Sequence, residues 1–256
     1  MSTRRRYKNP PIEEALCEFR FEPGQEWDFT IPGKLHAELR DAYPGKPRHQ
    51  MAIQAAFGPR EGQPPNLMFR QGLAKVQLIT EDAKRIVGVG PDVLSIHMLK
   101  PYQDPARVEA IGWEEFRPRI DQALDAYWRV AEPAGVQRVG VRYINKIVVP
   151  CARVEPRRYV LCAPPDIHGL PDVLSNFFGR TEYVYDDGVR LVVTYAITDA
   201  PTGCVAFLLD IDVIWQGDEA IAKEDALARA DDLRVRERDA FEALITDEAR
   251  RLFDAD

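Results

Sequence analysis

The sequence predicts an α+β fold in which long helices pack on one face of an antiparallel sheet and the chain forms two similarly ordered halves. Several segments alternate apolar and polar residues with period two, as strands with one buried face do. Two long segments instead place apolar residues three and four apart, which is typical of amphipathic helices. The helices follow runs of strands rather than alternating with them one for one, and this order favours an antiparallel sheet.

The first half, residues 1–150, opens with a predicted strand at residues 15–21, where apolar and polar side chains alternate. A short helix is expected at residues 32–43, because apolar residues lie four apart and prolines follow it. Glycine and proline predict a loop at residues 57–65. The other elements expected in this half are strands at residues 67–69, 74–80, 85–89, 93–99 and 136–149 and an amphipathic helix at residues 113–131.

The second half, residues 151–256, repeats this order of elements, which suggests an internal duplication, although the halves share little sequence and one continuous domain is the alternative. An Asp-Gly pair at Asp187 and Gly188 predicts a hairpin turn. Thr246 would kink the last helix or cap a second segment. The expected elements are strands at residues 159–161, 182–185, 189–197 and 204–215 and helices at residues 170–178 and 226–253.

The composition argues against several classes of protein. The formal net charge of -7 disfavours broad, sequence-blind binding of nucleic acid, which needs a basic surface. No window approaches the roughly 20 apolar residues of a membrane helix, and no apolar segment follows the basic start, so we expect a cytoplasmic protein without a membrane partner. The cysteines and histidines lack the spacing of metal ligands, so we expect reduced thiols and no zinc site.

Three motifs distinguish the chain. They are Tyr7-x-Asn9-Pro10-Pro11-Ile12-x-Glu14-Ala15, Arg138-x-Gly140-x-Arg142-Tyr143-Ile144-Asn145-x-Ile147 and Leu233-Arg234-x-x-x-x-Arg238-x-Ala240-Phe241. Together they resemble a sporadically distributed, uncharacterised prokaryotic protein family over nearly the whole chain. That family has no established activity, so the resemblance implies only a similar domain organisation. Its patchy distribution implies an accessory or defence gene, by analogy alone.

Polar residues of the strongest predicted strands share one face of each strand, because residues two apart point to the same side. The candidate ligand-binding residues of this kind are Glu18, Arg20, Arg138, Arg142, Lys146, Asp210 and Asp212. If these strands are neighbours, acidic and basic side chains would form ladders opposite one another.

Two interpretations of such ladders remain open. The charges would form cross-strand ion pairs on a solvated sheet face, each contributing at most about 1 kcal/mol. Alternatively, the carboxylates would hold Mg²⁺ and the guanidiniums would neutralise phosphates in a groove. The second arrangement is similar in logic to that of triphosphate-tunnel enzymes, but their E-x-E-x-K strand motif is absent, and Glu18-x-Arg20-x-Glu22 stands in its place.

Asn145 falls on the apolar side of its predicted strand and completes the set of candidate ligand-binding residues. A buried amide must find hydrogen-bond partners, so Asn145 either satisfies nearby backbone groups or serves as a polar anchor in a ligand cavity.

Conventional catalytic signatures are absent from the sequence, including G-x-S-x-G, the P-loop and H-E-x-x-H. We therefore expect a non-enzymatic binding or adaptor protein that recognises a protein partner, needs no cofactor and is compatible with homo-oligomerisation. The alternatives are a phosphate- or nucleotide-binding module that uses Mg²⁺ at the charged strand face, and a carrier of an apolar small ligand in a helix–sheet cleft.

Overall fold

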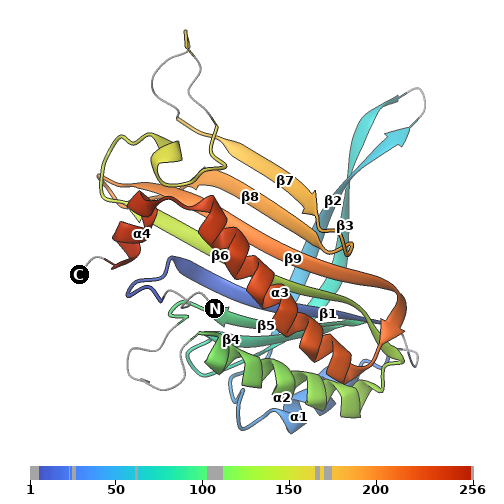
Figure 1. The fold of residues 1–256 in the computed structure, drawn as a ribbon. Helices are drawn as coiled ribbons and strands as arrows, with labels where there is room; N and C mark the ends of the chain where they lie inside the picture. The colour runs from blue at the N-terminus through green and yellow to red at the C-terminus, as the bar shows by residue number, and fades with distance from the viewer. Residues whose placement is uncertain are drawn as a thin grey trace.

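The computed structural model describes residues 6–22, 24, 27–60, 63–102, 112–164, 168–169 and 175–254, and for residues 50–60 and 63–74 it describes the backbone alone. Within these residues, nine strands form one antiparallel sheet in the order β2-β3-β4-β5-β1-β6-β9-β8-β7 (Figure 1). The strands are β1 (Ile12–Glu22), β2 (Arg48–Arg60), β3 (Gln63–Ile79), β4 (Arg85–Gly90), β5 (Val93–Leu99), β6 (Gly135–Val149), β7 (Phe178–Val184), β8 (Arg190–Thr198) and β9 (Val205–Ile221). The predicted antiparallel α+β class is confirmed.

Four helices accompany the sheet in the described part of the chain, and a single 3-10 turn spans Pro156–Arg158. Two are long, with 19 residues in α2 and 22 in α3, whereas α1 and α4 have 8 each. In Figure 1, α3 runs across β6 and β9, while α2 lies against β5 and beside α1. The helices are α1 (Ile31–Glu38), α2 (Trp113–Ala131), α3 (Lys223–Leu244) and α4 (Asp247–Asp254).

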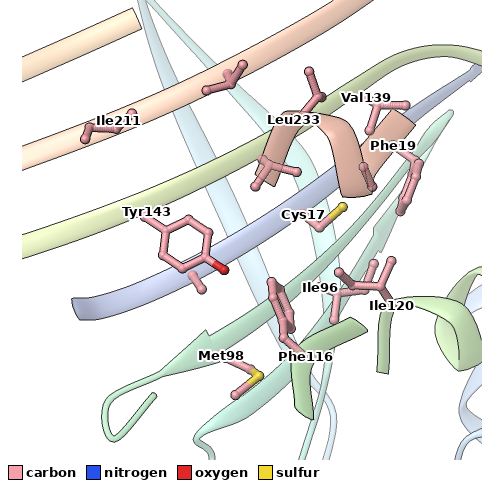
Figure 2. Packing of buried hydrophobic residues seen from close by; sticks show 14 of the residues in the cluster. Cys17, Phe19, Ile96, Met98, Phe116, Ile120, Val139, Tyr143, Ile211 and Leu233 are labelled. Carbon is pink, nitrogen blue, oxygen red and sulfur yellow. The ribbon is translucent and has the colours of Figure 1, made fainter. Parts of the chain in front are cut away.

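The hydrophobic core lies between the sheet and the two long helices. Figure 2 shows side chains of β1, β5, β6, β9, α2 and α3 packed together, among them Cys17, Phe116 and Leu233. Tyr127 of α2 stacks on Phe21 of β1 with the ring centres 4.5 Å apart. Burying a large apolar side chain of this kind contributes about 1.5–3 kcal/mol, which explains why these side chains lie between the strands and the helices.

The predicted loop at residues 57–65 is wrong for the described part of this segment, because β2 extends to Arg60 and β3 begins at Gln63, and the two strands pair with each other. Cross-strand pairing satisfies the backbone groups there and outweighs the local preference of glycine and proline for turns. The register shifts between Gly58 and Arg60, and Arg60 pairs with Gln63. The prolines within this irregular stretch are Pro59, Pro64 and Pro65.

Three smaller predictions have different outcomes. The expected strand at residues 159–161 is only an isolated bridge between Val160 and Ile245. The expected helix at residues 170–178 lies largely outside the described residues, and its last residue begins β7. The final helix divides into α3 and α4, as one of the two readings of Thr246 predicts: the Thr246 hydroxyl accepts a hydrogen bond from the backbone N–H of Ala249 at 3.3 Å.

Within the residues that the structure describes, no helix is long and apolar enough to cross a membrane. The sheet is continuous across the predicted boundary between the two halves, because β6 of the first half pairs with β9 of the second. The internal duplication stays a prediction.

Candidate functional site

The strands that bear the predicted charged residues are neighbours, because β6 lies between β1 and β9 in the sheet. Arg142 pairs in register with Leu16 of β1 and with Asp212 of β9. Since side chains alternate along a strand, the charged residues share the face that points away from the core. The expected acidic and basic ladders therefore lie side by side.

Arg142 and Asp210 form the best-defined ion pair of this face. The Arg142 guanidinium donates from Nε to Oδ1 at 2.8 Å and from Nη2 to Oδ2 at 2.6 Å, which is the two-point geometry that suits a carboxylate. The Asp210 side chain is only 9% exposed, whereas that of Arg142 is 39% exposed. Arg142 thus covers and neutralises a nearly buried carboxylate.

Glu18 is the centre of a second group of ion pairs. Its Oε1 accepts from Arg138 at 2.7 Å and from Arg20 at 3.1 Å, and its Oε2 accepts from Lys75 at 2.9 Å. Lys75, which the sequence analysis did not single out, comes from β3 and also donates to the hydroxyl of Ser95 at 3.0 Å. Burial raises the pKa of Glu18, but Lys75 and the two arginines outweigh this effect and hold it below its usual value.

Two of the predicted residues remain outside these pairs. Asp212 makes no hydrogen bond or ion pair with any described residue, and burial raises its pKa to about 6. Lys146 lies on the same face farther along β6 and forms no ion pair with the residues that the structure describes. No group of three or more potential metal-ligating side chains occurs in the described ranges. The geometry therefore favours the interpretation of the ladders as ion pairs.

A different set of polar groups surrounds a cavity of about 180 Å³ on the opposite, helix-covered face of the sheet. The cavity is bounded by the segment before β1, the start of α2, the C-terminal half of β6 and the C-terminal half of α3. Its aromatic lining residues are Tyr7, Tyr102, Trp113, Tyr143 and Phe241. Its charged lining residues are Arg6, Glu114, Arg234, Glu237, Arg238 and Glu242.

Asn145 lines this cavity and is only 1% exposed. Its Nδ2 donates to the backbone oxygen of Leu209 at 3.1 Å and to that of Tyr143 at 3.4 Å. Because carbonyl oxygens only accept hydrogen bonds, these contacts fix which end of the amide faces the backbone. The amide Oδ1 has no partner among the described residues. Asn145 thus satisfies the backbone, as one reading predicts, and also lies at a cavity, as the other predicts.

A buried guanidinium forms one wall of the cavity. Arg234 of α3 lies over the ring of Tyr143, with its guanidinium carbon 4.3 Å from the ring centre, and pairs with Glu237 one turn along the helix. The hydroxyls of Tyr143 and Tyr102 hydrogen-bond to each other at 2.6 Å. Burial raises the pKa of Glu237 above its usual value against the opposing effect of Arg234.

The rim of the cavity is closed by contacts between distant segments. Arg6 pairs with Glu114 at the start of α2 at 3.0 Å. The hydroxyl of Tyr7 donates to Glu242 at 2.8 Å, and Arg250 donates to the same carboxylate at 3.2 Å. These contacts hold the segment before β1 against α3 and α4.

All three sequence motifs supply residues to this one cavity, although more than 80 residues separate each motif from the next in the chain. They are Tyr7, Pro10, Pro11 and Ile12 of the first motif, Tyr143 and Asn145 of the second, and Arg234, Arg238 and Phe241 of the third. The sequence analysis did not identify Arg234 or Glu237 as site residues. A signal was present, since Glu237 interrupts the apolar stripe of its helix four residues after Leu233, where a carboxylate is unexpected unless it is paired.

No protein-family model matches the chain, and no curated protein matches it at a significant level. The family resemblance of the motifs therefore stays a prediction.

Proposed function

We propose that the protein is a non-catalytic binding module and that the cavity between β6 and α3 is its recognition site. The observation that supports the proposal is Asn145, a buried amide that donates to two backbone carbonyls and whose acceptor oxygen, among the described residues, has no partner at the cavity wall. Buried polar groups are normally hydrogen-bonded, so a free acceptor beside a cavity indicates a position for a donor from a ligand.

The surroundings of Asn145 define the chemistry of the ligand. The guanidiniums of Arg6 and Arg234 are already paired with carboxylates, so the lining offers a ligand acceptor oxygens and aromatic rings beside the guanidinium of Arg238. The cavity volume of about 180 Å³ is below the range of about 300–1,000 Å³ usual for drug-sized ligands. We therefore propose a small molecule with an amine or amide N–H group and a flat apolar portion.

The charged strand face supports a phosphate ligand less well. Arg142 and Arg138 are each engaged by a carboxylate at 2.8 Å or less, so a phosphate would have to displace Asp210 and Glu18. A small ligand in the helix–sheet cleft is closer to the carrier predicted from the sequence, although the lining is polar and aromatic rather than purely apolar.

A ligand-observed NMR screen tests the proposal, with small amines and amides as one set of compounds and with phosphates, nucleotides and Mg²⁺ as the other. We expect hits in the first set. Trp113→Leu at the cavity should weaken their binding at least tenfold. Trp128→Leu is the matched control, because it makes the same change in the same helix at a residue that does not line the cavity.

Two results would contradict the proposal. One is equal loss of binding in the two tryptophan variants, because the cavity would then have no special role. The other is Mg²⁺-dependent binding of phosphates that Trp113→Leu leaves unchanged and Arg142→Met abolishes, which would move the site to the charged face.

A further inference from the structure

The strand β7 forms one edge of the sheet, and in the described ranges of the chain no strand pairs with its outer side. Edge strands expose unpaired backbone groups, and proteins usually protect them with charges, prolines or covering segments. β7 carries the charged residues Arg180 and Glu182, but it also exposes large apolar side chains: Phe178 is 74% exposed, Val184 is 67% exposed and Tyr183 is 52% exposed. This edge has the properties of an interaction surface.

The sequence of β7, Phe-Gly-Arg-Thr-Glu-Tyr-Val, is complementary to itself in the antiparallel direction. If Thr181 lies opposite the partner's Thr181, then Arg180 lies opposite the partner's Glu182 and Phe178 opposite the partner's Val184. Residues directly opposite each other in an antiparallel pair have Cβ atoms about 4.5–5.5 Å apart, close enough for ion pairing and apolar contact. Each contact occurs twice, as a two-fold axis requires.

We propose that two copies of the chain dimerise by pairing β7 with β7 about a two-fold axis at Thr181, so that two sheets join into one. Such an interface closes on itself, whereas pairing between unlike edges would continue into a filament. This inference does not depend on the cavity.

The charges on β7 are free to exchange partners on dimerisation. Within one chain, Arg180 lies 3.5 Å from Glu182 and Arg190 lies 3.4 Å from the same carboxylate, which are long contacts between partly exposed side chains. Contacts of this kind contribute little in water, so replacing them with pairs across the interface has a low cost. Opposite charges then select the antiparallel register centred on Thr181.

A charge-swap experiment tests this register. The oligomeric state of wild type, Arg180→Glu, Glu182→Arg and the double variant would be measured by light scattering during gel filtration over a range of concentrations. We expect wild type to be a dimer and each single variant to be a monomer, because two like-charged pairs would then meet across the axis. The double variant should dimerise again, and an equimolar mixture of the two single variants should form a heterodimer.

Two further variants keep the test informative if a charge reversal disturbs folding, which circular dichroism would show. Val184→Lys would place charges against the partner's Phe178 and should yield monomers, whereas Val235→Lys, on exposed α3 surface, should leave the dimer intact. A wild-type protein that is monomeric at its highest soluble concentration would overturn the proposal. Dimers that persist in Arg180→Glu, Glu182→Arg and Val184→Lys would also overturn it, because another interface would be responsible.

Discussion

Asp212 shows how burial of a single side chain creates a pH dependence. Burial raises its pKa from the usual 3.8 to about 6, with Arg138 and Arg142 opposing the effect and Asp210 and Glu18 adding to it. A group whose pKa is higher in the folded state binds its proton more tightly there. Its contribution to stability is therefore complete below about pH 4 and is lost as the pH rises through about 6.

We expect Asp212→Asn to remove this loss. Relative to wild type, the free energy of unfolding of the variant should rise on the order of 2 kcal/mol between pH 4 and pH 7, because the neutral amide has no charge to desolvate. Urea unfolding at several pH values measures the difference. Asp218→Asn, at an exposed position, serves as the control, and an identical pH profile for both variants would show that Asp212 is not the cause.

Arg142 and Asp210 should contribute jointly to the free energy of unfolding rather than to ligand binding. Arg142→Met leaves a nearly buried carboxylate without its partner, which should cost about 1–3 kcal/mol. In a double-mutant cycle that combines Arg142→Met with Asp210→Asn, we expect urea unfolding to give an interaction energy of about 1–3 kcal/mol between the two residues. Additive single effects would contradict this view.

A surface pair of the same geometry provides the comparison for that cycle. Arg236 donates two hydrogen bonds to Asp187 at 2.8 and 2.7 Å, but the Asp187 side chain is 45% exposed. Exposed pairs contribute at most about 1 kcal/mol. A double-mutant cycle at Arg236 and Asp187 should therefore give a smaller interaction energy than the cycle at Arg142 and Asp210. The difference between the two interaction energies measures the effect of burying Asp210.

At the scale of elements, the start of α4 depends on one hydroxyl. Thr246 accepts a hydrogen bond from the N–H of Ala249 and donates to the backbone oxygen of Arg158, which links the helix to the 3-10 turn. We expect Thr246→Ala to lower the free energy of unfolding by about 1 kcal/mol, since the first turn of the helix loses its cap. Thr246→Ser keeps the hydroxyl and should retain most of the stability in the same thermal or urea measurement.

The elements also show where local patterns predict structure well. The helix predicted at residues 113–131 coincides with α2, because its apolar stripe is long and Pro133 and Gly135 follow it. The hairpin of β2 and β3 was missed, because its stability comes from pairing between strands rather than from its own glycine- and proline-containing sequence. Local sequence patterns therefore identified an element whose apolar residues recur with a strong periodicity, and missed strands that are stabilised by pairing with each other.

At the scale of the whole molecule, the single sheet connects the two predicted halves. β6 ends the first half and pairs with β9 of the second from Val136 with Ile221 to Val149 with Val205. Separating the chain after residue 150 would expose both strands and the core beneath α3. Fragments 1–150 and 151–256 should therefore be unfolded alone and should regain structure when mixed, as followed by circular dichroism. Cooperative unfolding of either isolated fragment would contradict this expectation.

The sequence by itself determined which residues face the core, because the period-two and period-3.6 patterns are local and each side chain follows its own backbone. It thereby predicted the antiparallel α+β class and the charged face of Glu18, Arg142 and Asp210. Tertiary structure alone decided which charges meet. Lys75 reaches Glu18 across 57 residues, and Asn145 meets Arg234 and Trp113 at one cavity. Such encounters depend on strand order and helix placement, which arise from packing of the whole chain and are not encoded in any local pattern.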